Sequence, residues 1–102
     1  MIRHIVLIRF RPDVTEAAIS GIFAVLPQLA ARLPGVQGYA AGRSESPEQI
    51  ERGYMHGFTI DFDDWDALAN YQADAGHKAF GGALVAHAVG GIDGILVFDL
   101  GM

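Results

Sequence analysis

The sequence contains no cysteine, and this absence removes several kinds of chemistry. Disulfide bridges, thiolate nucleophiles and cysteine-ligated metal centres are all excluded. No two of the four histidines have the i, i+4 spacing of a helical metal-binding pair, and no acidic residue is placed to complete a ligand set. We therefore expect no metal site formed by side chains. Backbone carbonyls at residues 33–36 stay open as ligands for a weakly bound cation.

Positive charge and long apolar runs are also scarce. Seven Lys and Arg residues stand against twelve Asp and Glu residues, so the net charge is -5 and no basic surface for nucleic acid is expected. No apolar run approaches the roughly 20 residues of a transmembrane helix, and no basic segment precedes a long apolar stretch. We expect a cytoplasmic protein that binds neither nucleic acid nor membrane.

Nucleotide-binding motifs are missing as well. No glycine-rich loop followed by Lys-Ser or Lys-Thr, and no dinucleotide fingerprint, lies between an expected strand and an expected helix. The Gly81-Gly82 pair falls inside an expected helix, where it permits close packing or leaves space at a pocket wall. We therefore expect no cofactor.

The chain does have enough apolar sequence for one core. It is 102 residues long and 51% hydrophobic, which predicts a single domain over residues 1–102. Alternating apolar residues predict strands at 2–11, 36–44, 53–62 and 92–100. Apolar spacings of three and four predict helices at about 13–33, 63–76 and 77–89, with a kink or a division at Pro27 and with Trp65 as a core anchor.

This order of elements predicts an α+β fold of the ferredoxin-like βαββαβ type. Short connections and right-handed crossovers favour a four-stranded antiparallel sheet with the helices on one face. The opposite face is then bare, and on the first strand it carries Ile5 and Leu7 between Arg3 and Arg9. A second copy packed sheet to sheet covers such a face, so we expect a homodimer.

Two histidines share the apolar faces of their strands. His4 is in phase with Val6, and His56 is in phase with Phe58, so both imidazoles are expected to point under the helices. A buried imidazole needs hydrogen-bond partners. Each is therefore either satisfied by local structure or directed into a polar cavity.

Several motifs together resemble the stress-responsive α/β-barrel (Dabb) family over nearly the whole chain. They are His4-Ile5-Val6-Leu7, Arg9-Phe10-Arg11-Pro12-Asp13, Pro34-Gly35-Val36, Ser46-Pro47-Glu48, Gly53-Tyr54-Met55-His56 and Leu96-Val97-Phe98-Asp99. The resemblance implies a dimeric α+β barrel.

The resemblance extends to family members of the olivetolic acid cyclase type, which close polyketide rings without a cofactor. Those enzymes use a tyrosine and a histidine six residues apart, and Tyr71 and His77 have that spacing. The resemblance also implies pocket positions for His4 and His56. Plant members commonly carry a His-Pro step between the tyrosine and the histidine, where this chain has Asp74 and Ala75.

These residues define a hypothesis and its alternatives. His77 is expected to remove a proton next to a carbonyl, and Tyr71 to donate to the oxygen that becomes negative. Alternatively, Tyr71 is a rim residue, His77 a helix cap, and the protein a non-catalytic stress-associated small-ligand-binding or structural dimer. The expected cavity for a small hydrophobic carbonyl or aromatic ligand is lined by His4, Val6, Ile8, Phe23, Leu26, His56, Phe58, Tyr71, His77, Phe80 and Val97.

Overall fold

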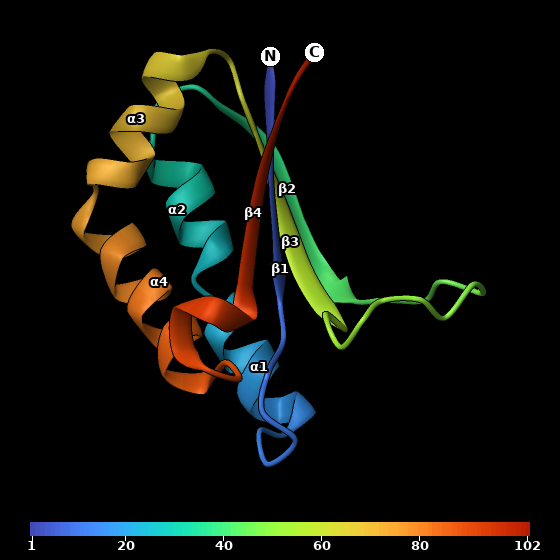
Figure 1. Cartoon of the computed structure of the whole chain (residues 1–102). Helices are drawn as coiled ribbons and strands as arrows, with labels where there is room; N and C mark the ends of the chain where they lie inside the picture. Colours follow the sequence, from blue (N-terminus) through green and yellow to red (C-terminus); the bar gives the residue numbers. More distant parts are fainter.

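The computed structural model describes all residues from 1 to 102 and is built on one antiparallel sheet. Its four strands lie in the order β2-β3-β1-β4 (Figure 1). They are β1 Ile2–Ile8, β2 Val36–Arg43, β3 His56–Phe62 and β4 Ile95–Gly101. The predicted ferredoxin-like arrangement is confirmed.

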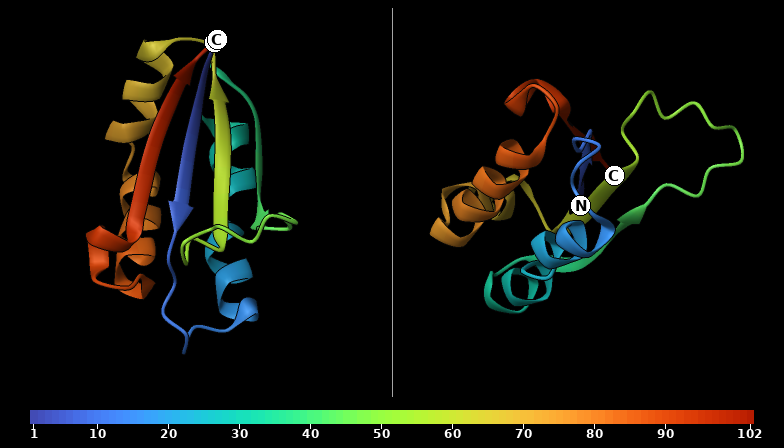
Figure 2. Two further views of the ribbon diagram at one scale, coloured as in Figure 1. Left: turned by 45° about the vertical axis from the view of Figure 1, so that its right-hand side comes forward. Right: turned by 90° about the horizontal axis from the view of Figure 1, so that it is seen from below.

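The helices all cover the same face of the sheet (Figures 1 and 2). They are α1 Glu16–Phe23, α2 Leu26–Arg32, α3 Trp65–Ala73 and α4 Ala75–His87, and a short 3-10 helix, η1 Gly91–Gly94, leads into β4. None of these helices combines the length and the apolarity needed to cross a lipid bilayer.

The first helical region is divided rather than kinked. α1 ends at Phe23 and α2 starts at Leu26, which places Pro27 in the first turn of α2. A proline is tolerated there because the backbone N–H groups of a first turn have no partner within the helix. The single helix expected to extend to Leu33 is therefore two shorter helices.

Other expected boundaries are wrong as well. The strand expected at 2–11 ends at Ile8, and the strand expected at 92–100 begins at Ile95, after η1. β3 begins at His56 and not at Gly53, because Gly53 has a φ of 90° and belongs to the loop of residues 44–55. This loop projects beyond the sheet (Figure 1). α4 begins at Ala75 and not at His77, because the Asp74 side chain accepts a hydrogen bond from the His77 backbone N–H. The cap fixes the start of the helix.

Trp65 is not a core anchor. It is the first residue of α3, and 59% of it is exposed. Asp64 caps this helix, and the buried positions that follow are Leu68 and Tyr71. The indole therefore lies at the free end of the helix, outside the stripe that packs on the sheet.

The core lies between the helices and the inner faces of β1 and β3. Both strands alternate strictly between buried and half-buried residues, as expected for strands with one covered face. The buried apolar residues are Ile2, Val6, Ile8, Ile19, Phe23, Leu26, Leu29, Leu33, Phe58, Ile60, Phe62, Leu68, Tyr71, Phe80, Leu84 and Ala88.

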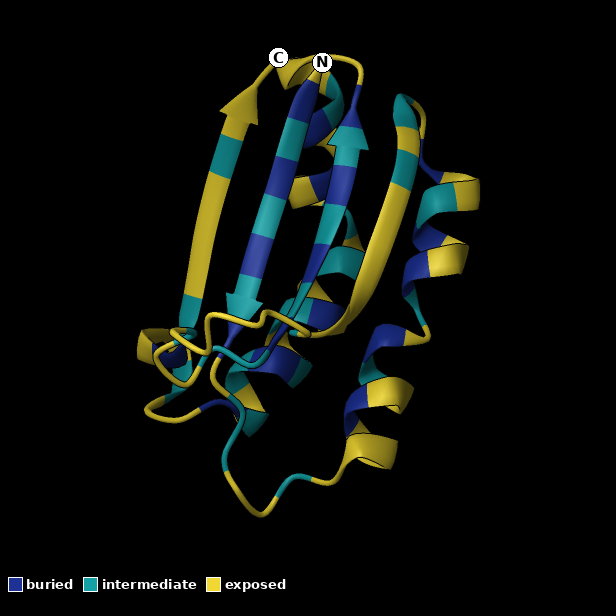
Figure 3. Ribbon diagram, turned by 90° about the vertical axis from the view of Figure 1, so that its right-hand side faces the viewer, coloured by how far each residue is buried: buried dark blue, intermediate teal, exposed yellow.

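The outer face of the sheet is open, and β4 at its edge is largely exposed (Figure 3). The large apolar residues of this face lie on β1 and β4. Ile5 pairs with Phe98 across these strands, and Leu7 pairs with Leu96. Phe98 is 54% exposed. The face thus carries an uncovered apolar centre, as predicted.

Candidate functional site

Tyr71 and His77 come from consecutive helices and lie against each other. Tyr71 is in the last turn of α3 and His77 in the first turn of α4, and their ring centroids are 4.2 Å apart. Asp74 is both the C-cap of α3 and the N-cap of α4. The tight connection brings together the two side chains that the sequence singled out.

Asp74 fixes the connection between the two helices. Its carboxylate accepts the His77 backbone N–H at 3.1 Å and two guanidinium hydrogen bonds from Arg32 of α2, at 2.7 and 2.8 Å. The hydrogen bonds from Arg32 hold the pKa of the Asp74 carboxyl well below its usual range. Asp74, and not His77, is therefore the helix cap.

The His77 ring has a defined tautomer. Its Nδ1 lies 3.2 Å from the Gln72 backbone oxygen, and because a carbonyl only accepts, Nδ1–H must donate. Nε2 is then left with its lone pair. Burial lowers the pKa of His77, and so favours the neutral ring. His77 is thus prepared to accept a proton at Nε2.

The Tyr71 hydroxyl is a buried donor without a partner. The residue is only 1% exposed, and its Oη makes no hydrogen bond. Burial raises the pKa of the phenol, which therefore keeps its proton. An unpaired buried hydroxyl costs about 1–3 kcal/mol, so its persistence needs an explanation, and a ligand acceptor is one. The interpretation of Tyr71 as a rim residue is wrong.

His4 adds a second imidazole. It is 4% exposed, and its Nδ1 lies 2.5 Å from Oδ1 of Asp99, its cross-strand partner on β4. An ionised carboxylate only accepts, so Nδ1–H donates and Nε2 is left for another partner. The His4 and Tyr71 ring centroids are 5.8 Å apart.

These three rings line one cavity of about 260 Å³ between the sheet and α4. The other lining residues are Val6, Phe58, Gln72, Phe80, Gly81, Leu84, Val85, Ile92, Ile95 and Val97. The structure therefore gathers most of the expected lining residues, including Val97 of the edge strand. Ile8, Phe23 and Leu26 are buried in the core but do not line this cavity.

His56 lies elsewhere, at the opposite end of the sheet. Its Nε2 is 3.0 Å from both carboxylate oxygens of Glu16, and Oε1 of Glu16 also accepts from Arg43 at 2.6 Å. Hydrogen bonds from His56 and Arg43 lower the pKa of Glu16. The His56 ring packs edge-on against Phe10, with centroids 5.4 Å apart. This histidine is satisfied by a local network and does not share a cavity with Tyr71 and His77.

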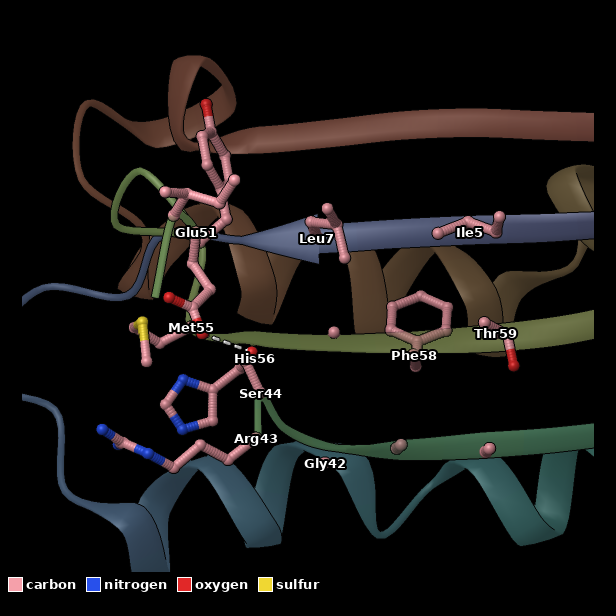
Figure 4. Close-up of a pocket in the computed structure, with 15 residues that line it drawn as sticks. Ile5, Leu7, Gly42, Arg43, Ser44, Glu51, Met55, His56, Phe58 and Thr59 are labelled. Carbon is pink, nitrogen blue, oxygen red and sulfur yellow. Dashed lines mark hydrogen bonds between the residues drawn. The ribbon is translucent and has the colours of Figure 1, made fainter. Parts of the chain in front are cut away.

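A separate hollow of about 580 Å³ opens on the outer face of the sheet (Figure 4). Ile5 and Leu7 form part of its floor, and the projecting loop forms one side. Within that loop the Ser44 hydroxyl donates to Glu51 at 2.5 Å. The hollow shares Phe58 with the cavity described above and is also lined by His56, but it contains none of His4, Tyr71 and His77.

Sequence reasoning missed two groups of the candidate site. Asp99 shares the alternation of Ile95 and Val97, so a carboxylate on the cavity face of the last strand could have been noticed. Gln72 contributes its backbone carbonyl, which accepts the hydrogen bond from His77. Every residue type has such a carbonyl, so the sequence could not single it out. No three His, Asp or Glu side chains converge in a way that could hold a metal ion.

Comparison with known proteins agrees with this architecture. The chain superimposes on a dimeric ferredoxin-like protein of unknown function from Jannaschia sp. CCS1 with a TM-score of 0.92 and 35% identity, covering 99% of this chain and 98% of that one. A hydroxynitrile lyase from Passiflora edulis has the same fold, with a TM-score of 0.81 and 20% identity over 97% of this chain and 90% of that one.

Sequence comparison gives a similar result. Olivetolic acid cyclase from Cannabis sativa is 22% identical over 80 residues, which are 78% of this chain and 79% of the cyclase. The family model described as Stress responsive A/B Barrel Domain matches residues 2–101. The chain therefore belongs to the stress-responsive A/B barrel (Dabb) domain family.

Proposed function

We propose that this protein is a cofactor-independent acid/base enzyme of the cyclase or lyase kind, acting on a small hydrophobic carbonyl or aromatic compound. One observation carries the proposal. The buried, unpartnered hydroxyl of Tyr71 lies beside an imidazole whose free Nε2 is available as a base, at one cavity. The name of the related olivetolic acid cyclase supports the cyclase reading.

The first step is enolisation. His77 Nε2 takes a proton from the carbon next to a ligand carbonyl, and the C–H bonding pair becomes the new C=C bond of an enolate. The carbonyl oxygen gains negative charge, and the Tyr71 hydroxyl donates to it. A preorganised donor in a cavity with little water is most effective at this stage, because its dipole needs no reorganisation.

Ring closure follows when the enolate carbon attacks a second carbonyl of the same molecule. A C–C bond forms, and the new alkoxide takes the proton back from His77, so the step is balanced without an oxidant or a reductant. His4 presents Nε2 as an acceptor for a ligand hydroxyl, and Asp99 acts as its positioning residue. A lyase reaction is the reverse of this sequence.

Proton exchange tests the first step directly. The wild-type protein is incubated with phenylacetone in D2O, and loss of the signal from the protons next to the carbonyl is followed by NMR. We expect catalysed exchange in the wild type. Replacing Tyr71 by Phe should reduce the rate about 10²-fold to 10³-fold, the typical effect of removing one oxyanion donor.

The stability of the same variant is the control. Tyr71→Phe deletes a buried hydroxyl that has no partner, so the melting temperature should stay equal or rise. Lower activity without lower stability supports a site. Lost stability with an unchanged exchange rate contradicts the proposal, and ligand binding without any wild-type exchange favours the non-catalytic binding protein.

We also propose that the protein works as a homodimer joined through the outer faces of two sheets. The half-buried Ile5 and Leu7 of β1 pair with the exposed Phe98 and Leu96 of β4 to form a continuous apolar face, and the Jannaschia relative is described as dimeric. Sedimentation equilibrium should give twice the mass of the 10.9 kDa chain. Phe98→Glu should give single chains, and a wild-type protein that sediments as a single chain at high concentration contradicts the proposal.

A further inference from the structure

Helix α4 separates two hollow spaces. On one side lies the cavity of about 260 Å³ that holds Tyr71 and His77. On the other side, between α4 and the pair α1 and α2, lies an apolar groove of about 530 Å³. Small α4 residues, Ala79 and Ala83, line the groove, whereas His77, Gly81 and Leu84 line the cavity.

Phe80 is the one residue that lines both spaces. It is 4% exposed, and its ring packs on Phe58 of the sheet with centroids 5.1 Å apart. The ring therefore fills the gap beneath α4 through which the cavity and the groove would otherwise connect.

The size of the cavity makes this wall relevant to ligand choice. Its volume lies below the roughly 300–1,000 Å³ of pockets that hold drug-sized ligands. A single aromatic ring with a short substituent fits such a space. A longer aliphatic chain needs further buried volume, and the groove behind Phe80 supplies it.

We propose that Phe80 is the specificity-determining residue of the cavity. Its ring limits the ligand to one aromatic ring with a short aliphatic chain, and it keeps longer chains out of the groove. The inference rests on the proposed function only in taking the Tyr71 cavity as the ligand site.

Binding of 4-alkylphenols, from methyl to hexyl, tests the inference by calorimetry. These probes lack a carbonyl, so their binding does not depend on turnover. Each buried methylene should tighten binding about fourfold until the chain reaches Phe80, after which wild-type affinity should stop rising. In Phe80→Ala the rise should continue for at least two more carbons, which is a further gain of about 15-fold.

Two further variants distinguish loss of the Phe80 wall from a general increase in cavity volume. Leu84 lines the cavity but not the groove, so Leu84→Ala enlarges the cavity alone. The alkyl chain length at which affinity stops rising should therefore stay within one carbon of the wild-type value. Adding Ala83→Leu to Phe80→Ala fills the groove and should restore the short limit. If Phe80→Ala does not fold, Phe80→Leu serves instead and should extend the limit by about one carbon.

The outcomes decide the inference. An unchanged limit in the Phe80 variants, an equal extension in Leu84→Ala, or no binding of any probe to any variant overturns it. Failure of the proposed function would give a different result. If the wild type does not exchange phenylacetone protons but the 4-alkylphenols show the predicted dependence on chain length, the proposed reaction is wrong and the role of Phe80 stands.

Discussion

The two ends of the sheet each hold a buried histidine hydrogen-bonded to a carboxylate, but only His4 shares a cavity with Tyr71 and His77. His56 lines a different hollow, of about 250 Å³, together with its partners Glu16 and Arg43. His4 is paired with Asp99 through Nδ1, and its Nε2 is left over. His56 is paired with Glu16 through Nε2, and the same carboxylate also holds Arg43. The two histidines are similarly buried and have the same phase on their strands. Their hydrogen-bond partners, which come from distant parts of the chain, therefore decide which histidine can bind a ligand.

The largest difference is expected between His77 and His56. His77→Ala should lower the exchange of phenylacetone by about 10²-fold to 10⁴-fold, because it removes the base, with little change in stability for a half-buried ring. His56→Ala should leave the rate per folded molecule unchanged and lower stability by about 1–3 kcal/mol, because a packed side chain is lost from the core. Exchange rates and urea melts of both variants are the measurements, and equal rate losses would remove the distinction.

The carboxylates provide a second, smaller contrast. Asp99→Asn replaces a carboxylate that only accepts by an amide that can accept or donate, so the His4 tautomer is no longer fixed. 4-Ethylphenol should then bind about threefold to tenfold more weakly, the loss of one hydrogen bond. Glu16→Gln should leave the dissociation constant unchanged. Calorimetry measures both, and a larger effect at Glu16 would place ligand binding at the wrong end of the sheet.

Acid should affect the two ends at different pH values. Because burial lowers the pKa of His77, the neutral base persists below the ordinary histidine value of about 6.5, and the acidic limb of the exchange rate should lie below that value. Glu16 has a lowered pKa, so its contribution to stability is complete above the ordinary glutamate value of about 4.3 and is lost as the pH falls through the lower folded value.

Two measurements check this order. A pH-rate profile locates the acidic limb of activity, and a limb centred above about 6.5 disagrees with a buried His77. Urea melts at several pH values locate the loss of stability. Glu16→Gln should flatten the stability curve below about pH 4.3, and an unchanged curve would show that the His56 network is not its source.

The fold was largely predictable from the sequence because its signals are local. Alternation on β1 and β3 and the apolar spacing of the helices are set by neighbouring residues. Apart from the exposed Trp65, the errors occur at boundaries: α4 starts at Ala75, after the cap Asp74, rather than at His77, and Gly53 lies in a loop. Capping and positive φ decide such ends, and neither appears in an apolar pattern.

The candidate site was only partly predictable. The spacing of Tyr71 and His77 pointed to the pair, and the strand phase pointed to burial of His4 and His56. Phase could not reveal that His56 binds Glu16, 40 residues away, or that His4 binds Asp99, 95 residues away. Such partners depend on tertiary packing, which places His4 in the cavity of Tyr71 and His77 and places His56 elsewhere.

The adjacent glycines of α4 offer the finest comparison. An added Cβ at Gly81 or at Gly82 meets nothing within 4 Å, but only Gly81 lines the cavity. Alanine at either position should stabilise the protein by about 0.5–1 kcal/mol, because glycine is a poor helix former. Gly81→Leu should weaken 4-ethylphenol binding and Gly82→Leu should not, as calorimetry can measure. Equal effects would contradict the assigned cavity wall.

Histidine-selective NMR with saturating 4-ethylphenol tests the central contrast most directly, since each of the four histidines gives its own ring signals. The ring signals of His77 and His4 should shift on binding, while those of His56 and His87 stay in place. A shift confined to His56, or the absence of any shift at His77 under saturation, would contradict a ligand site at the Tyr71 cavity.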